Sequence, residues 1–365
     1  MTEKRVIFLV PTLNKGGAER VVSILSNYLS DKFNTTIVTF SSELPQFNIK
    51  ANHVSLEAGA YKNIFMKIFN VFVRVFKLRK FIKKNRPDLT ISFMESSNIP
   101  AILATRFLNW DNYLIVSVRN NPSMFPWYYR FLIKLLYKLS DKIVSPSFGI
   151  YEELKKYIQD SNRIIFIPNP IDYEIIKSQS LQESDLLTRL PKKYILGVGR
   201  LTYQKGFDRL LSIFSKVKNE EMGLVILGEG ELRQELNSLA QEYGLEKNIF
   251  MPGAVDNPFP IFKSATCLAL TSRYEGWPNV INESIASGCP VISYNCNYGP
   301  KEILDFDNAF LIEEDDEDRF VEAISILDED KEIREKYIKA GLKNIDKYSV
   351  TRIAMLWLEK TGLKL

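Results

Sequence analysis

The sequence predicts an α/β protein with two parallel-sheet domains. Strand-like apolar runs alternate with helical patterns along the chain, the order that parallel sheets with crossover helices require. The chain has 365 residues, 45% hydrophobic and 25% charged, which is enough for two cores of domain size. The polar, proline-flanked stretch 168–191 breaks the alternation. We therefore expect domains at 1–170 and 193–349, joined by a linker at 171–192.

The first domain is expected to contain strands wherever a short apolar run is bounded by turn residues or charges. These strands are Arg5–Leu13, Thr35–Ser41, Asp88–Phe93, Leu114–Val118, Lys142–Ser145 and Arg163–Ile167, with His53 near the start of a further short strand. Apolar residues at helical spacing predict helices between them. These helices are Gly17–Leu29, Lys62–Lys84, Ile99–Leu108, Pro126–Leu139 and Ile150–Ile158.

The second domain repeats this alternation. Its expected strands are Tyr194–Val198, Gly223–Leu227, Ile249–Met251, Cys267–Leu270 and Val291–Ser293. The tail is expected to be helical at Asp316–Leu327, Asp330–Tyr348 and Thr351–Trp357. The acidic run Glu313–Asp318 fits a loop and a helix start, where carboxylates suit the helix dipole, better than a metal site.

A strand, turn and helix unit in the second domain carries two carboxylates. The run Thr266–Thr271 looks like a buried strand and is followed closely by RYEGWPNVINESIAS. Gly276 and Pro278 suit a tight turn and the first turn of a helix, which places Glu275 in the turn and Glu283 on the helix. Free N–H groups at a helix start favour an anion, and carboxylates accept hydrogen bonds from hydroxyls. The unit therefore predicts a ligand with phosphate and hydroxyl groups; the alternative is a surface helix with two solvated glutamates.

A second strand and helix unit carries two cations. The run YILGVG begins at Tyr194 and reads as a strand, Arg200 and Lys205 follow it, and apolar residues recur at helical spacing from Phe207. Open α/β sheets bind ligands at this position, between the end of a strand and the start of a helix. Two cations there can neutralise a diphosphate without a metal. Taken singly, each cation is more typical of a solvated charge, and it is their pairing at a glycine-framed strand end that favours a binding site.

Five motifs, in this order and spacing, resemble one known family. GRLTYQKGFDRLL, VILGEGELRQEL, MPGAV and EGWPNVINE are similar to the C-terminal domain of retaining GT-B glycosyltransferases of family 4, and VPTLNKGGAER resembles the first glycine loop of that family. The resemblance runs from Val6 to about Tyr348 and includes bacterial enzymes that extend polyprenyl-diphosphate-linked glycans. It implies a GT-B fold: two Rossmann-like domains facing across a cleft, an N-terminal one for the acceptor and a C-terminal one for the nucleotide-sugar donor. The last helix, at about 350–365, would cross back onto the N-terminal domain.

The resemblance also implies roles for residues in these motifs. Arg200, Lys205 and Glu275 are the catalytic candidates: the cations would stabilise the leaving diphosphate, and Glu275 would contact hydroxyls of the donor sugar. Glu283 would bind the ribose hydroxyls. The other donor-binding candidates are Gly16, Gly17, Gly199, Gly228, Gly230, Val255, Gly276, Trp277, Pro278, Asn279 and Val280.

The sequence departs from the family at one position. Many relatives have a histidine after the fourth or fifth N-terminal strand, whereas SVRNNP here carries Arg119 and Asn120, and His53 is the chain's single histidine. A mechanism that needs a histidine base is therefore not expected. The family's retaining route, in which the departing diphosphate takes the acceptor proton, needs none. Glu19, Arg119 and Asn120 are candidates for binding the acceptor or a phosphate; for Arg119 the alternative is a plain charge at a strand end.

The segment Tyr61–Arg86 predicts a basic, aromatic helix. It has nine basic residues and no acidic one, and apolar residues interleave with the cations. Such a helix can lie in an anionic membrane surface or bind a lipid diphosphate; the alternative is a sheet-packed helix with a solvated face. The lipid-contact candidates are Lys77, Lys80, Lys83 and Lys84. Nucleic acid is not expected as a partner, because the rest of the chain carries no basic recognition motif.

Composition excludes several other classes. No apolar run approaches the roughly 18 residues of a membrane-spanning helix, and only a short apolar run follows the charged start MTEKR. We therefore expect a cytoplasmic protein, peripheral on the inner face of the cytoplasmic membrane. Cys267, Cys289 and Cys296 are odd in number and form no Cys-x-x-Cys pair, so neither a disulfide framework nor a zinc site is expected.

These observations predict a retaining glycosyltransferase that moves a hexose or N-acetylhexosamine from a UDP-sugar to a polyprenyl-diphosphate-linked saccharide, without a metal cofactor. The UDP moiety follows from the resemblance alone. Three alternatives stay open. They are a transferase with a small soluble acceptor, a UDP-sugar epimerase of the same architecture, and a non-catalytic sugar-nucleotide-binding subunit. The epimerase is disfavoured because its chemistry needs acid/base carboxylates and often histidines.

Overall fold

The computed structural model of the chain describes residues 4–14, 16–59, 64–106, 108–305 and 307–361, with the backbone alone for 64–68. The chain divides into two compact units. The first is Met1–Pro170 together with Val350–Leu365, and the second is Ile171–Ser349. Each unit has its own parallel sheet.

The first unit is built on a parallel sheet with the strand order β3-β2-β1-β4-β5-β6-β7. Every residue of β4 is buried, because helices cover both faces of the sheet. The strand order reverses at β1, and ligands of open α/β sheets bind at the carboxyl ends of the strands at such a point. The strands are β1 (Arg5–Val10), β2 (Asn34–Thr39), β3 (Asn52–Ser55), β4 (Leu89–Phe93), β5 (Tyr113–Ser117), β6 (Lys142–Ser145) and β7 (Ile164–Phe166).

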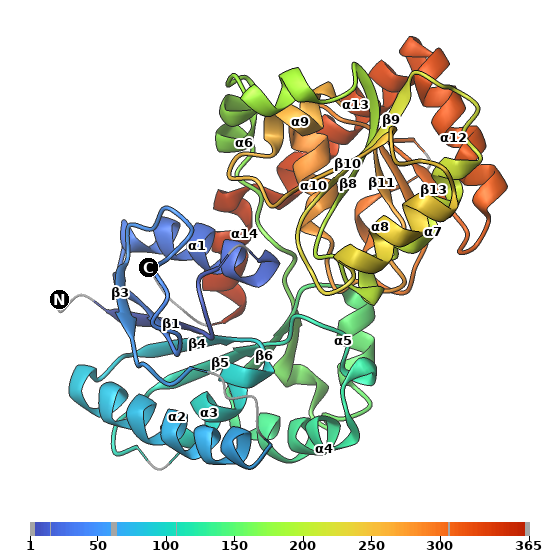
Figure 1. Cartoon of the computed structure of the whole chain (residues 1–365). Helices are drawn as coiled ribbons and strands as arrows, with labels where there is room; N and C mark the ends of the chain where they lie inside the picture. Colours follow the sequence, from blue (N-terminus) through green and yellow to red (C-terminus); the bar gives the residue numbers. More distant parts are fainter. Residues whose placement is uncertain (1–3, 15, 60–63, 107, 306, 362–365) are drawn as a thin grey trace. The chain divides into compact units, whose positions relative to one another are not determined.

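Helices α1 and α14 cover one face of this sheet, and α2, α3, α4 and α5 cover the other (Figure 1). The ring of Trp357 in α14 lies 5.9 Å from that of Phe93 in β4, so the last helix completes the core of the first unit. The helices are α1 (Gly17–Ser30), α2 (Ile64–Asn85), α3 (Glu95–Thr105), α4 (Trp127–Leu136), α5 (Phe148–Leu154) and α14 (Val350–Lys360), with short 3-10 turns η1 (Pro122–Met124), η2 (Tyr137–Leu139) and η3 (Ser161–Arg163).

The second unit has a parallel sheet with the order β10-β9-β8-β11-β12-β13, which reverses at β8. Its strands are β8 (Lys193–Val198), β9 (Met222–Leu227), β10 (Ile249–Gly253), β11 (Cys267–Leu270), β12 (Val291–Tyr294) and β13 (Phe310–Ile312). β13 has no counterpart among the predicted strands.

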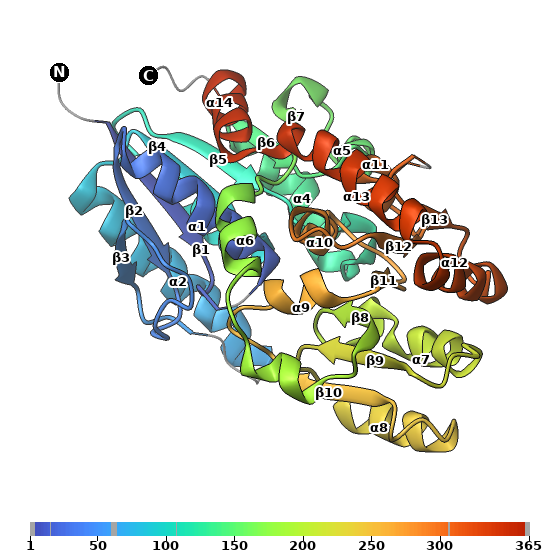
Figure 2. The ribbon, with the colours of Figure 1, turned by 90° about the horizontal axis from the view of Figure 1, so that it is seen from above.

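Helices α7, α8 and α12 pack on the core of this sheet, and α10 packs against α6, α9 and α13. Figure 2 shows α7 next to β9 and α8 next to β10. The helices are α6 (Tyr173–Ser180), α7 (Phe207–Ser215), α8 (Arg233–Glu242), α9 (Phe259–Ser264), α10 (Asn279–Ala286), α11 (Pro300–Ile303), α12 (Glu317–Glu329) and α13 (Lys331–Ile345), with η4 (Asp185–Arg189), η5 (Tyr203–Lys205) and η6 (Asp346–Tyr348).

The predicted linker 171–192 is instead a folded part of the second unit. It contains α6 and η4, and Ile171 pairs with Ser349 in an isolated β-bridge. The side chain of Asp172 caps α6, and Asn257 Nδ2 donates a hydrogen bond to Gln179 O (3.0 Å). The polar composition of the segment conceals this helix, because α6 needs few apolar residues to cover α9.

Helix α3 begins at Glu95 rather than at the predicted Ile99. Pro100 suggests a helix start in the sequence, yet it lies inside the helix. A proline has no N–H for the carbonyl four residues earlier, and here Arg74 of α2 donates to that carbonyl, Ser96 O, at 3.3 Å. Lys62, the predicted first residue of α2, lies outside the described residues.

Candidate functional site

The loop after β8 carries the two predicted diphosphate-binding cations. Arg200 follows β8, η5 ends at Lys205, and Gly206 adopts the left-handed conformation with φ +63° before α7. A Cβ atom at Gly206 would lie 2.2 Å from the carbonyl oxygen of Thr271, whose Oγ1 donates a hydrogen bond to Gly206 O (2.8 Å). Only glycine allows this approach. Gly206 therefore docks the loop after β8 against the loop after β11.

Lys205 and Glu275 form a buried ion pair. Their Nζ and Oε1 atoms are 2.6 Å apart, and the two side chains are 17% and 5% exposed. Ser272 Oγ donates a second hydrogen bond to the same carboxylate oxygen (2.7 Å). The sequence predicts these residues as separate groups for diphosphate and for sugar hydroxyls, and the structure joins them. Because an ammonium group has three donors, Lys205 can hold Glu275 and still bind an anion.

A second ion pair fixes the geometry of the first. Arg273 Nη1 donates to Asp208 Oδ1 (2.8 Å), and the guanidinium carbon lies 4.0 Å from the centre of the Tyr203 ring. The backbone N–H of Arg273 also donates to Gln204 O (2.9 Å). Burial acts to raise the pKa of Asp208, but the hydrogen bond and charge of Arg273 outweigh it and lower that pKa. The two loops are therefore locked together next to Lys205, by residues that are not among the sequence candidates.

The predicted donor-site glycines after β8 and β9 lie where two loops cross closely. A Cβ atom on Gly228 would lie 1.9 Å from Gly199 O, and one on Gly230 would lie 2.3 Å from Leu201 O. These glycines therefore have a packing role that is independent of any ligand. Arg200 is exposed on the same loop, and its side chain has no hydrogen-bond or ion-pair partner among the described residues.

The predicted ribose-binding carboxylate lies on α10. This helix begins at Asn279, so Pro278 occupies the N-cap position rather than the predicted first turn. Glu283 is buried in the second turn of the helix. Trp277, which directly precedes Pro278, is also buried. Its ring packs edge-on against Tyr348 at 5.3 Å, and its Nε1 has no hydrogen-bond partner in the described part of the chain.

The loop after β12 supports the turn that carries Glu275. The backbone N–H of Glu275 donates to Asn297 O (3.4 Å). A Cβ atom on Gly299, which has φ +90°, would lie 2.6 Å from Pro278 Cδ and 3.3 Å from Gly276 O. The predicted turn is thus held from two neighbouring loops. The remaining donor-site candidates are Val255, half-buried after β10, and Val280, buried on α10.

In the first unit, the glycine loop after β1 leads into α1. Gly16 is the N-cap of α1, Gly17 is its first residue, and Glu19 lies in the first turn. Thr12 Oγ1 donates to Glu19 Oε1 (3.3 Å). A Cβ atom on Gly16 would lie 2.3 Å from Glu19 Oε2, so the glycine leaves room for this carboxylate. The structure therefore brings these predicted residues together at the carboxyl end of β1.

Arg119 is buried at the end of β5, whereas Asn120 is exposed. The Arg119 guanidinium donates to Asn169 Oδ1 and to Ser117 Oγ (3.3 Å), and it lies 5.5 Å from the centre of the Phe93 ring. Burial lowers the pKa of Arg119 to about 10, although the charges of nearby carboxylates act to raise it. Arg119 is therefore a buried and fixed charge at the end of its strand.

Glu95, directly after β4, is a candidate that the sequence reasoning missed. It is 8% exposed, and its Oε1 has no hydrogen-bond partner among the described residues. Burial raises its pKa to about 7, although its own backbone hydrogen bond and Arg119 act to lower it. The preceding residue, Met94, has φ +71°, which is uncommon for a residue other than glycine. A carboxylate in the first few residues after an apolar strand, the signal that marks Glu275, also marks Glu95.

Helix α2 presents a partly exposed aromatic and basic face. Phe69, Phe72 and Phe76 are 60%, 69% and 72% exposed, and Lys80, Lys83 and Lys84 are exposed further along the helix. Lys77 differs from the other predicted lipid-contact lysines, because its Nζ donates to the backbone oxygens of Leu56 (2.9 Å) and Glu57 (3.0 Å). The described helix therefore keeps three of the four candidate lysines on its surface.

Three expectations about other sites can be compared with the described residues. Cys267, Cys289 and Cys296 are buried free thiols. Within the described part, no group of three or more His, Cys, Asp or Glu is arranged to hold a metal ion, and no helix is long and apolar enough to cross a membrane. Asp316 caps α12 within the acidic run Glu313–Asp318.

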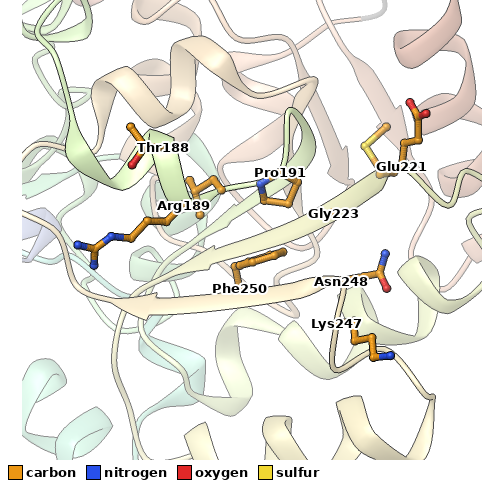
Figure 3. A pocket seen from close by; sticks show the side chains of 10 residues that line it. Thr188, Arg189, Pro191, Glu221, Gly223, Lys247, Asn248 and Phe250 are labelled. Carbon is orange, nitrogen blue, oxygen red and sulfur yellow. The ribbon is translucent and has the colours of Figure 1, made fainter.

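A surface hollow of about 300 Å³ lies beside the amino ends of β9 and β10 (Figure 3). The catalytic candidates follow the carboxyl ends of β8 and β11, at the other edge of the same sheet. The hollow therefore does not belong to the predicted site. Its lining includes Thr188, Arg189, Pro191, Glu221, Gly223, Lys247, Asn248 and Phe250.

Two parallel-sheet units, each with its candidate binding loops at the carboxyl ends of the strands, are the architecture of the GT-B fold. The solved structure of Anabaena Alr3699/HepE in complex with UDP and glucose has this fold, with a TM-score of 0.81 and 16% identity over 98% of this chain and 99% of that one. The sequence model "Glycosyltransferase Family 4" matches residues 15–175, and "Glycosyl transferases group 1" matches residues 179–344. The chain belongs to glycosyltransferase family 4.

Two relatives from Campylobacter jejuni are similar over almost their whole length. One, the N-acetylgalactosamine-N,N'-diacetylbacillosaminyl-diphospho-undecaprenol 4-alpha-N-acetylgalactosaminyltransferase, is 30% identical over 98% of this chain and 99% of its own. The other, a GalNAc-alpha-(1->4)-GalNAc-alpha-(1->3)-diNAcBac-PP-undecaprenol alpha-1,4-N-acetyl-D-galactosaminyltransferase, is 28% identical over 97% of each chain. The full-length match covers both units.

Proposed function

We propose that this glycosyltransferase moves a hexose or an N-acetylhexosamine from a UDP-sugar to a polyprenyl-diphosphate-linked saccharide, with retention of anomeric configuration, in the assembly of a surface polysaccharide or protein-linked glycan. The observation that carries the proposal is the Lys205–Glu275 pair, with Arg200 exposed on the same loop as Lys205. The acceptor class is supported by the Campylobacter relatives, whose names give undecaprenol-linked acceptors. The UDP donor is supported by the UDP complex of the structural neighbour.

In this mechanism the bond between the anomeric carbon and the diphosphate oxygen breaks. Negative charge develops on the diphosphate and positive charge on the sugar ring. Lys205 and Arg200 stabilise the diphosphate, and Glu275, held by Lys205, accepts hydrogen bonds from the hydroxyls of the donor sugar. The acceptor oxygen forms the new bond on the same face, and its proton passes to the departing diphosphate. No side-chain base is needed.

Glu283 completes the donor site by accepting hydrogen bonds from the ribose hydroxyls. Its burial on α10 supports this role, because a buried carboxylate binds hydroxyls without competition from bulk water. Uracil is the proposed base. A thermal-shift comparison of UDP-, GDP- and ADP-sugars with the full chain tests this choice, and equal shifts for all three would contradict it.

The acceptor is proposed to reach the first unit from an anionic membrane surface, at the inner face of the cytoplasmic membrane. The exposed phenylalanines and lysines of α2 support this, since aromatic side chains enter the interface and lysines attract anionic headgroups. Three exposed phenylalanines argue against the alternative of a sheet-packed helix with a solvated face, because exposing apolar rings to water is unfavourable.

The protein is proposed to work without a metal, because its own cations stabilise the diphosphate. Initial rates should therefore be the same in EDTA and in Mg²⁺ or Mn²⁺. A strict requirement for either ion would contradict the role of Lys205 and Arg200.

The decisive experiment measures UDP release by the full chain with a panel of UDP-sugars and a polyprenyl-diphosphate-linked saccharide extract. NMR of the product should show the anomeric configuration of the donor. The same saccharide without its lipid serves as the soluble acceptor, and equal kinetics with both would favour a soluble-acceptor enzyme. If no acceptor supports UDP release, the result would contradict sugar transfer and favour a non-catalytic binding subunit.

A further inference from the structure

Three charged side chains follow neighbouring strands of the first sheet. Glu19 lies in the first turn of α1 after β1, Glu95 begins α3 after β4, and Arg119 follows β5. These strands are adjacent at the point where the strand order reverses. The charges of Glu19 and Glu95 both act to raise the pKa of Arg119, so each carboxylate lies within electrostatic range of the guanidinium. The carboxyl ends at such a reversal are where an open sheet binds its ligand.

The carboxyl group of Glu95 lacks the partner that a buried group needs. Its Oε1 is inaccessible to water and accepts no hydrogen bond from the described residues, and Arg119 forms no direct ion pair with it. An unpaired buried oxygen destabilises a fold, and a ligand hydroxyl that donates to it removes this cost. Ser97 Oγ and Asn98 Oδ1, in the first turn of α3, are buried without partners as well.

Arg119 is fixed in place and still has donors to offer. Asn169 and Ser117 accept two of its hydrogen bonds, and a guanidinium has five N–H donors. The unusual backbone of Met94 holds the start of α3, and therefore Glu95, directly after β4. Glu95, after β4, thus offers an acceptor oxygen without a partner, and Arg119, after the neighbouring strand β5, offers donor N–H groups. A hydroxyl group can bridge them, since it donates one hydrogen bond and accepts another.

We propose that Glu95 and Arg119 bind a hydroxyl group of the acceptor saccharide. Glu95 accepts the hydrogen bond of that hydroxyl, and Arg119 donates one to its oxygen. The pair thereby selects which saccharide the first unit accepts. This inference rests on the proposed function, because it takes the first unit as the acceptor-binding one.

The test compares Glu95→Gln with Glu153→Gln. Glu153 is the matched control: it is a buried glutamate of the same unit, but its carboxylate accepts hydrogen bonds from Lys156 Nζ (2.6 Å) and Tyr157 OH (3.4 Å). In UDP-release assays with the lipid-linked saccharide, Glu95→Gln should raise the KM for the acceptor about tenfold, because a charge-assisted hydrogen bond is lost. The Kd for UDP, measured by calorimetry, should stay unchanged in both variants. An unchanged acceptor KM in folded Glu95→Gln would overturn the proposal.

Absence of any transfer by the unaltered protein would refute the proposed function without deciding this inference. In that case calorimetric titration of the UDP-saturated full chain with the same lipid-linked saccharide in detergent decides it. Weaker binding by Glu95→Gln than by the unaltered protein and Glu153→Gln would support the hydroxyl site. Equal binding by all three proteins, or binding by none, would overturn it.

A proton-release measurement separates hydroxyl binding from a merely structural role of Glu95. A hydroxyl that donates to the carboxylate favours its ionised form, so binding near pH 7 should release a proton. Arg119 after β5, Tyr129 on α4 and Tyr137 in η2 lie within electrostatic range of Glu95, Glu19 on α1 acts on the same Arg119, and Arg74 on α2 donates to Ser96 O beside Glu95. Calorimetry in two buffers of different ionisation enthalpy should show release in the unaltered protein and none in Glu95→Gln. Equal release by both would overturn the proposal.

Discussion

Glu275 in the second unit and Glu95 in the first have similar positions but different surroundings. Each is buried shortly after the carboxyl end of a central strand. Glu275 accepts hydrogen bonds from Lys205 and Ser272, whereas Glu95 has an oxygen without a partner and a pKa raised by burial to about 7.

This difference indicates two kinds of binding site. The Glu275 site is electrostatically complete, because its cation is already in contact with the carboxylate, and it can hold an anion on the same cation. The Glu95 site is incomplete, and a neutral hydroxyl is the group that completes it. A nucleotide diphosphate is an anion of the kind that suits the Glu275 site, and a saccharide hydroxyl is a neutral group of the kind that suits the Glu95 site.

The largest effect on activity is expected when the Glu275 site loses its cation, Lys205. Lys205→Ala should lower kcat/KM roughly 10²–10³-fold, because one preorganised donor to the developing charge is lost. The variant should also be less stable, since Glu275 is left buried without its cation. UDP-release kinetics and thermal unfolding measure the two effects.

The double variant Lys205→Ala/Glu275→Gln is the control for Lys205→Ala. It removes the unpaired charge, so it should recover stability while activity stays low. Recovery of activity together with stability would show that Lys205 only supports the fold.

The second largest effect concerns the exposed face of α2. Each lysine near an anionic surface adds roughly 1 kcal/mol of attraction, and salt screens it within about 10 Å. Changing Lys80, Lys83 and Lys84 together to Gln should therefore weaken binding to anionic liposomes by up to roughly 100-fold at low salt, measured by co-sedimentation. UDP affinity should be unchanged.

The matched control has the same charge change on a helix of the second unit, with Lys331, Lys336 and Lys339 of α13 changed to Gln. If both triple variants lose liposome binding equally, net charge rather than α2 is responsible. If neither does, α2 is a sheet-covering helix with a solvated face.

Glu283→Ala should have a smaller effect, on donor binding. Loss of a hydrogen-bond acceptor for the ribose hydroxyls should raise the Kd for UDP about tenfold. The exposed Glu329→Ala on α12 is the control, and it should bind UDP normally. Unaltered calorimetric affinity in Glu283→Ala would remove Glu283 from the donor site.

The comparison also shows what the sequence can predict. Contiguous motifs identify Lys205, Glu275 and Glu283, because the strand, turn and helix that position each of them are local. Lys205 and Glu275 are 70 positions apart in the sequence. They meet because the sheet order places β8 next to β11. The Asp208–Arg273 pair is hidden for the same reason.

Other features are hidden by competing local signals. The helix predicted from Ile99 begins at Glu95 in the structure, so the sequence leaves Glu95 in a loop where its burial is not foreseen. The polar composition of 171–192 likewise predicts a linker where α6 packs on α9. Both errors arise because tertiary contacts supply interactions that the local sequence lacks. For example, Arg74 donates the hydrogen bond to Ser96 O that Pro100 cannot donate.

The smallest expected effect is a change in the stability of the ligand-free protein that comes from the carboxyl group of Glu95. The pKa of Glu95 is raised to about 7 in the folded chain from an ordinary value of 4.5, so the folded state favours the protonated carboxyl. The stability that this provides is present below pH 4.5 and is lost as the pH rises through about 7. Glu95→Gln keeps a neutral side chain at every pH, so its Tm relative to the unaltered protein should rise by a few °C between pH 5 and pH 8. Glu153→Gln, which removes a buried carboxylate paired with Lys156, is the control, and scanning calorimetry measures both variants. A constant Tm difference for Glu95→Gln across this range would mean that the carboxyl is ionised and satisfied in solution, and the contrast with Glu275 would then disappear.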